Sequence, residues 1–197
     1  MAVGIRIPDS TIASQAFELA REMQSESLTN HCTRTYLFGA LAAERDELKY
    51  DGEAFYIGAM LHDLGLVPPY DALPRPFEIE GADAARSFLE AHGYAAAKAA
   101  LVREAIANHL SLDAAGMQPE VALVHIGAAA DVVGMRLDRI AADELARVLV
   151  EYPRLGFKRE VQTLLGAQVR QKPASTIAFM YEKLNFERLF MDAPFEE

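Results

Sequence analysis

Apolar residues recur along this chain at intervals of three and four positions, the spacing that places them on one face of an α-helix. The strict alternation typical of half-buried strands is essentially missing. The pattern predicts helices at about residues 11–24, 27–48, 81–91, 94–110, 120–135, 143–152, 157–171 and 173–184, besides a central helix that ends near Gly65. We therefore expect an all-α fold of about seven to nine helices.

The central helix carries the most unusual local pattern. It is apolar almost throughout, yet His62 and Asp63 stand side by side in its predicted last turn, just before Gly65. Burying a carboxylate without a partner costs on the order of several kcal/mol, or shifts its pKa until the group is neutral. A divalent cation held by both side chains would compensate for this cost.

A proline-rich segment follows directly after this helix. Pro68, Pro69, Pro74 and Pro76 all lie within residues 67–79. Proline removes a backbone donor and is excluded from helix interiors, so this segment is predicted to be a loop. Its position makes it a natural wall or lid for a site at the His62-Asp63 pair.

No internal repeat, low-complexity segment or Gly/Ser-rich linker interrupts the chain. Residues 1–197 are therefore expected to form a single domain, with a core at about residues 25–175. The N-terminal helix and the phenylalanine-rich tail are then appendages. The tail aromatics are expected in the core or in a subunit contact, so a homo-oligomer is one assembly to consider.

The composition is that of an acidic globular protein, with 51% hydrophobic residues and a formal net charge of −10. This charge argues against a nucleic-acid binder or a binder of anionic membranes. The longest apolar tract, at residues 121–135, is too short to span a bilayer and contains His125 and Asp131. We recognise no signal peptide and find a single cysteine, Cys32, so a cytoplasmic location is expected.

Other polar residues of the same kind stand in apolar helices. His31, His109, His125 and Asp131 are each compatible with a hydrogen-bonded structural role when taken alone. Together with the His62-Asp63 pair they spread over four predicted helices, whose side chains can converge inside a bundle. Imidazole and carboxylate ligands suit a divalent Zn, Fe, Mn, Co or Ni ion. His125 and Asp131 project about 120° apart on a straight helix, so two neighbouring roles are expected rather than one shared ion.

The order His31, His62-Asp63, Asp131 in a helical context resembles the HD-domain superfamily of metal-dependent phosphohydrolases. A larger part of the chain is similar to the cyanamide hydratase-like branch of that superfamily. The similar segments are Leu28–Tyr36, Leu61–Leu66, Phe77–Ala85, Pro119–Gly134, Pro153–Lys158 and Lys172-Pro173, within about residues 25–175. The resemblance implies an HD-domain helical bundle built around a metal.

The resemblance also implies four metal ligands for one or two divalent ions: His31, His62, Asp63 and Asp131. His109 and His125 match additional histidines that hold a second metal in some HD proteins and contact the substrate in others. Asn108 replaces the more usual apolar residue before His109, and this departure leaves the role of His109 open.

A bound divalent cation lowers the pKa of water from about 15.7 to roughly 7 and so supplies hydroxide at neutral pH. His109 and His125 are predicted to move protons if they hold no second ion. Glu78, beside the proline-rich segment, is a weaker catalytic candidate because it also fits a helix cap. Arg34 lies one turn from His31, and is predicted either to hold an anionic substrate or to pair with a ligand carboxylate.

We therefore expect a metal-dependent hydrolase that uses an activated water on a small-molecule substrate, with hydration of a small nitrile such as cyanamide as the favoured reaction. The alternative is hydrolysis of a nucleotide-type phosphoester, which needs cations around the developing phosphate charge. Few basic residues stand near the motifs. A non-catalytic metal- or ligand-binding regulator is a third interpretation, against which the complete ligand set counts.

Overall fold

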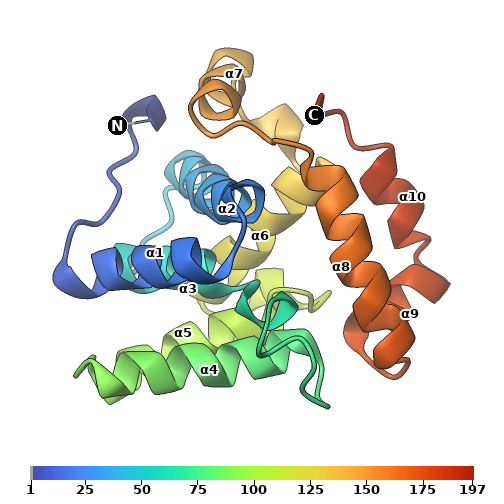
Figure 1. Cartoon of the computed structure of the whole chain (residues 1–197). Coiled ribbons are helices and arrows are strands. Elements are labelled where there is room, and N and C mark those ends of the chain that lie inside the picture. Colours follow the sequence, from blue (N-terminus) through green and yellow to red (C-terminus); the bar gives the residue numbers. More distant parts are fainter. Residues whose placement is uncertain (1) are drawn as a thin grey trace.

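Helices make up all the regular secondary structure in residues 2–197, the part of the chain that the computed structural model describes (Figure 1). The α-helices are α1 (Thr11–Met23), α2 (Glu26–Arg45), α3 (Gly52–Leu61), α4 (Phe77–Ala91), α5 (Ala96–Asn108), α6 (Pro119–Val133), α7 (Ala142–Glu151), α8 (Phe157–Gln171), α9 (Thr176–Lys183) and α10 (Phe186–Met191). Four short 3-10 helices lie in the connections: η1 (Ala2–Gly4), η2 (Leu64–Leu66), η3 (Ala114–Gly116) and η4 (Leu137–Arg139). The predicted all-α class is confirmed.

The tail supplies one helix more than the expected range. Asn185 adopts a left-handed backbone conformation, with φ of 53°. Asparagine tolerates this region better than most residues, and a helix cannot continue through it. The tail is consequently divided into α9 and α10, and the described residues contain ten α-helices rather than seven to nine.

Two helix boundaries next to the His62-Asp63 pair differ from prediction. Helix α3 ends at Leu61 rather than near Gly65, so the pair follows the last turn instead of lying within it. Helix α4 begins at Phe77, so the loop predicted for residues 67–79 ends earlier. Pro76 stands just before that first helical residue, where the missing N–H of proline costs no helical hydrogen bond.

Helices α2 and α6 cross at the centre of the bundle with their backbones in contact. A Cβ atom on Gly127 of α6 would overlap the backbone carbonyl of Thr35 on α2. On the other helix, a Cβ on Gly39 would lie 2.7 Å from the carbonyl oxygen of Leu123. Only glycine leaves room for this approach, which brings the side chains of the two helices into one buried layer.

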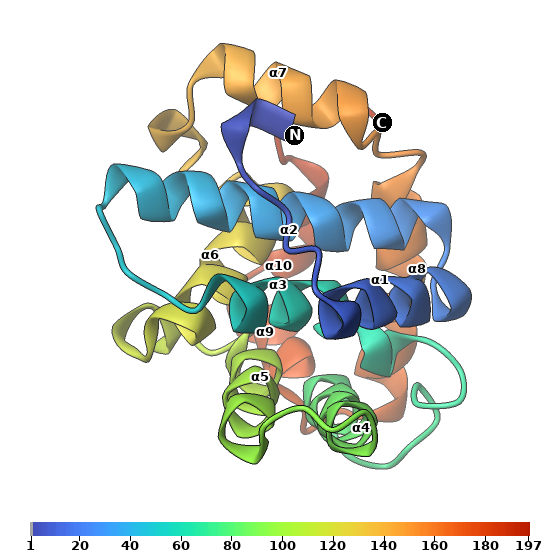
Figure 2. The same cartoon turned by 90° about the vertical axis from the view of Figure 1, so that its left-hand side faces the viewer.

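Helices α8, α9 and α10 form a layer on one side of the molecule, opposite α1 (Figure 1). Figure 2 shows the same arrangement from the side of α1 and α2, with α9 and α10 behind them. This layer has its own hydrophobic cluster, which includes Leu28, Leu64, Leu66, Phe77, Phe157, Val161, Leu165, Ile177, Phe186 and Phe190. The C-terminal helices therefore pack against the region that follows α3. None of the described helices combines the length and apolar composition required to cross a bilayer.

Candidate metal centre

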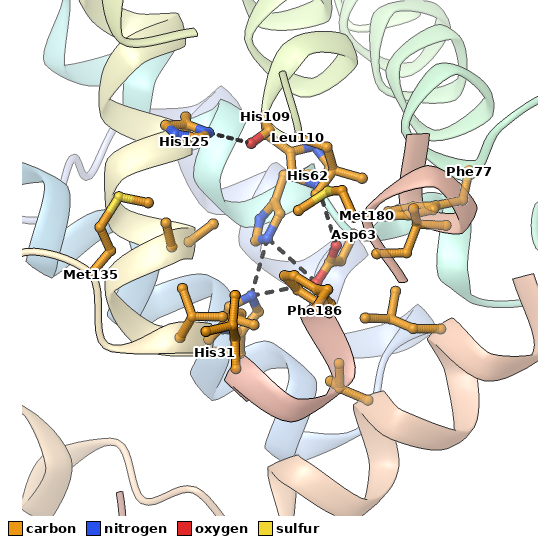
Figure 3. Close-up of a pocket in the computed structure, with 18 of the residues that line it drawn as sticks. His31, His62, Asp63, Phe77, His109, Leu110, His125, Met135, Met180 and Phe186 are labelled. Carbon is orange, nitrogen blue, oxygen red and sulfur yellow. Dashed lines mark hydrogen bonds and ion pairs between the residues drawn. The ribbon is translucent and has the colours of Figure 1, made fainter. Parts of the chain in front are cut away.

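Three side chains from two segments of the chain converge in the buried interior. His31 lies on α2, which is N-capped by the Ser25 hydroxyl, while His62 and Asp63 follow α3, which is N-capped by the Asp51 carboxylate. The Nε2 atoms of His31 and His62 are 3.1 Å apart. Asp63 Oδ2 lies 3.5 Å from the first and 3.4 Å from the second (Figure 3). Such a group of ligand atoms is what a metal ion requires.

The hydrogen bonds of both histidines leave these nitrogens without a proton. His31 Nδ1–H donates to Asp131 Oδ2 at 2.7 Å, and His62 Nδ1–H donates to the Ala59 carbonyl oxygen at 2.7 Å. Because both partners are acceptors, the neutral rings carry their proton on Nδ1 and direct the Nε2 lone pair inward. Two lone pairs and a carboxylate then face one another, an arrangement that a divalent cation stabilises. These residues fit a metal ion.

Burial controls the charge of this group. His31 and His62 are each 1% exposed and Asp63 is 6% exposed. Burial, assisted by the neighbouring His31, lowers the pKa of His62 to about 3, so this ring is neutral and able to coordinate at pH 7. Burial raises the pKa of Asp63, which shows how strongly the interior resists an unneutralised carboxylate.

Asp131 does not join this group, although the resemblance assigns it as a fourth ligand. Its carboxylate binds the other nitrogen of His31, and both oxygens are also engaged by arginines. Arg34 donates from Nε at 2.8 Å and from Nη2 at 2.8 Å, and Arg154 donates from Nη1 at 3.0 Å. Asp131 therefore contacts the nitrogen of His31 that faces away from His62 and Asp63, a position from which a carboxylate can orient a metal-binding histidine.

The surroundings hold Asp131 ionised. Burial by itself raises the pKa of Asp131, but the Arg34 guanidinium and the His31 hydrogen bond outweigh burial and set the pKa well below its ordinary value. Arg34 is 0% exposed and also donates to the carbonyl oxygens of Tyr152 and Pro153. Of its two predicted roles, the pairing with a carboxylate matches this placement, because Arg34 is not among the residues that line the cavity described below.

Arg154 is a residue of this arrangement that the sequence pattern does not single out. Its guanidinium carbon lies 4.8 Å from the Phe157 ring centroid and 4.4 Å from that of Phe195. The Phe157 ring in turn stacks on His31, with 4.5 Å between ring centroids. The sequence feature that could have indicated Arg154 is its position in the Pro153–Lys158 segment, which resembles the cyanamide hydratase-like branch.

His109 and His125 lie beside the three converging side chains (Figure 3). His109 Nδ1–H donates to the Ile106 carbonyl oxygen at 2.7 Å, and its Nε2 lies 3.9 Å from Asp63 Oδ1. His125 Nδ1–H donates to the His109 carbonyl oxygen at 2.8 Å. Each ring therefore directs an unprotonated Nε2 away from its backbone partner. Burial, together with the nearby His62, lowers the pKa of His109 to about 3.

Glu78 is not brought together with these residues. It lies in the first turn of α4, is 2% exposed, and is absent from the walls of the cavity described below. Burial raises its pKa, and its neighbours are Thr176 and Lys172. This position does not support the catalytic role predicted for it, and its place inside α4 also excludes the predicted cap of a helix starting at Gly81.

The histidines and Asp63 form the polar end of a cavity of about 240 Å³. His31, His62, Asp63, His109 and His125 supply all the polar side chains that line it in the described part of the chain. The remaining wall is apolar, with Phe77, Leu110, Met135, Met180 and Phe186 labelled in Figure 3. A largely apolar pocket with a few convergent polar groups is the usual form of a small-molecule site.

Comparison with known proteins agrees with this geometry. The profile of the HD domain family matches residues 28–147, which contain the three converging side chains. Two similar proteins are the cyanamide hydratases DDI2 and DDI3 of Saccharomyces cerevisiae (strain ATCC 204508 / S288c), each 28% identical over 170 residues. Each alignment covers 81% of this chain and 75% of the yeast protein. With its buried His31, His62 and Asp63 and its all-helical fold, the chain belongs to the HD domain family, as a metal-dependent hydrolase.

Proposed function

We propose that this protein hydrates a small, uncharged nitrile to the corresponding amide. The observation that carries the proposal is the cavity itself, in which a set of metal-ligating side chains closes one end of an otherwise apolar space. The similarity to two cyanamide hydratases supports the same reaction class. In the reaction, water adds its oxygen to the nitrile carbon, one proton moves to the nitrile nitrogen, and the resulting imidic acid rearranges to the amide.

His31, His62 and Asp63 would hold the metal, and Asp131 would orient His31 through its Nδ1–H. When bound, a divalent ion supplies an acidified water and polarises the group that is attacked. The Nε2 atom of His109, close to Asp63, accepts a hydrogen bond from that water and so orients it.

His125 is the residue we assign to proton transfer. It is only half-buried, so its ring is able to carry a charge at lower cost than the fully enclosed His109. Its Nδ1–H is held by a backbone carbonyl, which leaves Nε2 to take a proton from water and return it to the nitrile nitrogen.

A phosphoester substrate is poorly accommodated by the same cavity. Developing phosphate charge requires arginine, lysine or several metal ions around it. Of the described residues that line the cavity, none is a lysine or an arginine. Arg34 and Arg154, the basic residues that contact Asp131 beside His31, are both held in ion pairs with its carboxylate.

The test is a direct assay with cyanamide. Metal-loaded protein should form urea far faster than the same protein after treatment with a chelator, and re-addition of the metal should restore the rate. Formation of phosphate or nucleoside from nucleotides, with no hydration of cyanamide or of other nitriles, would refute the proposal and favour the phosphohydrolase alternative.

A further inference from the structure

The cavity wall beyond the histidines has a chemistry that cyanamide does not match. It is built by α6, α8, α9 and α10, with Val132, Val161, Leu165, Ile177, Met180 and Phe186 among the contributing residues. No hydroxyl or amide side chain lines it within residues 2–197. A substrate group that projects from the polar end therefore contacts hydrocarbon and thioether groups.

The size of the cavity also indicates a substrate larger than cyanamide. Its volume of about 240 Å³ exceeds the roughly 150 Å³ of an apolar cavity that accommodates benzene. On that scale it accommodates about six to ten non-hydrogen atoms. Cyanamide would leave most of the space unfilled, and its amino group would face apolar side chains without an acceptor, which costs free energy.

The opening of the cavity is apolar as well. Leu112, Met135, Leu184 and Leu189 line the cavity and are respectively 65%, 42%, 37% and 53% exposed. Exposed side chains that also line a cavity mark its opening. Grouped apolar residues of this kind at the surface are typical of a site that receives an apolar molecule.

We propose that the substrate is an uncharged nitrile whose cyano carbon bears an apolar group of about five to eight non-hydrogen atoms. The inference rests on the proposed nitrile hydration and assigns the substrate class. The cyano group lies against His31, His62 and Asp63, and the apolar group extends between α6 and the α8–α10 layer. Helices α9 and α10 thus determine specificity.

A homologous series tests this assignment. With metal-loaded full-length protein, kcat/KM is measured for cyanamide, acetonitrile, butyronitrile, hexanenitrile and benzonitrile by quantifying the amide formed. Burial of each additional methylene should raise kcat/KM about fourfold, which gives about 250-fold over the four methylenes between acetonitrile and hexanenitrile. Constant or falling values along the series, with cyanamide as the best substrate, would overturn the inference and leave nitrile hydration standing.

Two variants locate the apolar group. Ala129 lies one helical turn after His125 and lines the cavity, so Ala129→Leu should reduce kcat/KM for hexanenitrile at least tenfold more than for acetonitrile. Ala97→Leu is the matched control, because Ala97 is exposed on α5 and away from the cavity. Leu189 is half-exposed at the opening, so Leu189→Asn should not require the core to repack. It should also lower kcat/KM for hexanenitrile more than for acetonitrile. Equal effects on both nitriles would contradict the assignment.

A binding measurement provides a readout apart from turnover. Hexanamide, the product, should raise the Tm of the metal-loaded protein, as any ligand of the folded state does, and acetamide at the same concentration should not. In Ala129→Leu, the two amides should no longer differ in their effect on Tm. Hydration of none of the nitriles would instead remove the proposed function and this inference with it.

Discussion

The two nitrogens of His31 face different surroundings. Nε2 points toward His62 and Asp63, whereas Nδ1–H donates to a carboxylate that two arginines hold in place. A metal ligand whose second nitrogen donates to a carboxylate has a fixed tautomer and a fixed ring orientation. The strength of metal binding should therefore depend on residues that never touch the ion.

The direct ligands are tested by removing one carboxylate. Purified wild-type protein should contain about one or two equivalents of a divalent metal, and Asp63→Ala should lose it because the two remaining imidazoles do not suffice. Elemental analysis measures this. Asp113→Ala, at an exposed position, is the control that should retain the metal. Unchanged metal content in Asp63→Ala would refute the ligand assignment.

Replacement of Asp131, which we propose orients His31, should weaken metal binding less than Asp63→Ala does. Asp131→Asn keeps the size of the side chain but removes the charge that faces Arg34 and Arg154, so metal affinity should fall by about 10–100-fold. Competition with a chelator measures the affinity. The exposed Asp143 supplies the control, Asp143→Asn, which should bind as wild type. Complete loss of metal would indicate that Asp131 is a direct ligand after all.

Proton transfer is tested at His125. His125→Gln should lower kcat for nitrile hydration by about 10²–10⁴-fold while metal content stays at the wild-type level. Parallel loss of metal would instead assign His125 to a second ion. The pH profile separates the two roles, because loss of a proton-transferring group removes one limb of the profile and loss of an ion does not.

Part of the site follows from the sequence and part does not. The HD resemblance points to His31, His62 and Asp63, and the structure groups them. Asp131, however, is separated from His31 by 100 positions, and which nitrogen it meets depends on how α2 and α6 cross. Arg154 meets Asp131 from the segment before α8, a contact that no spacing rule predicts.

At the scale of helices, the crossing of α2 and α6 sets the geometry of the centre. His31 and Arg34 come from one helix and Asp131 from the other, and the glycines at the crossing fix their separation. Because the two backbones are in contact, no space remains between them, and a single added methyl group at the crossing must displace one helix. The site is thus sensitive to a position that carries no functional group.

Gly127→Ala should be destabilising for this reason. The added Cβ would overlap the Thr35 carbonyl, and the expected cost of about 1–3 kcal/mol lowers Tm by about 2–10 °C. Calorimetry measures the change. At Gly116 an added Cβ meets nothing within 4 Å, so Gly116→Ala should leave Tm nearly unchanged. Equal Tm values for both variants would contradict the close approach.

Helix identity was easier to predict than helix ends. Periodic apolar residues predict the long helices because burial on one face repeats every turn. The end of α3 and the start of α4 depend instead on local backbone geometry at Leu61 and Pro76. The separation of α10 depends on a single left-handed residue, Asn185, within a tail whose Phe186 was expected in a core or subunit contact and lines the cavity.

At the scale of the whole molecule, the buried histidines couple stability to pH. His62 and His109 titrate near 3 in the folded protein because burial disfavours their charged forms, but near 6.5 when unfolded. Below pH 6.5 the unfolded chain therefore binds more protons than the folded one. Stability is complete above that pH and is lost as the pH falls toward 3.

Chelator-treated protein should consequently become less stable on acidification, with the free energy of unfolding falling by about 2 kcal/mol for each of the two histidines between pH 7 and pH 5. The raised pKa of Asp63 acts in the opposite sense and offsets part of the loss. Urea denaturation at several pH values measures the slope. His62→Asn should reduce it and His92→Gln, at an exposed position, should not. A slope of opposite sign would exclude neutral buried imidazoles.

The HD profile ends at residue 147, while the apolar wall of the cavity is completed by α8, α9 and α10. A single domain spanning residues 1–197 remains a prediction. The two parts of the chain nevertheless contribute different kinds of residue to the site. The candidate metal ligands all lie in the stretch that the profile covers, whereas the later stretch contributes only apolar residues to the cavity wall. Mutations in the later stretch can consequently change the range of substrates without altering the candidate metal ligands. This makes α9 and α10 the rational place to diversify this enzyme.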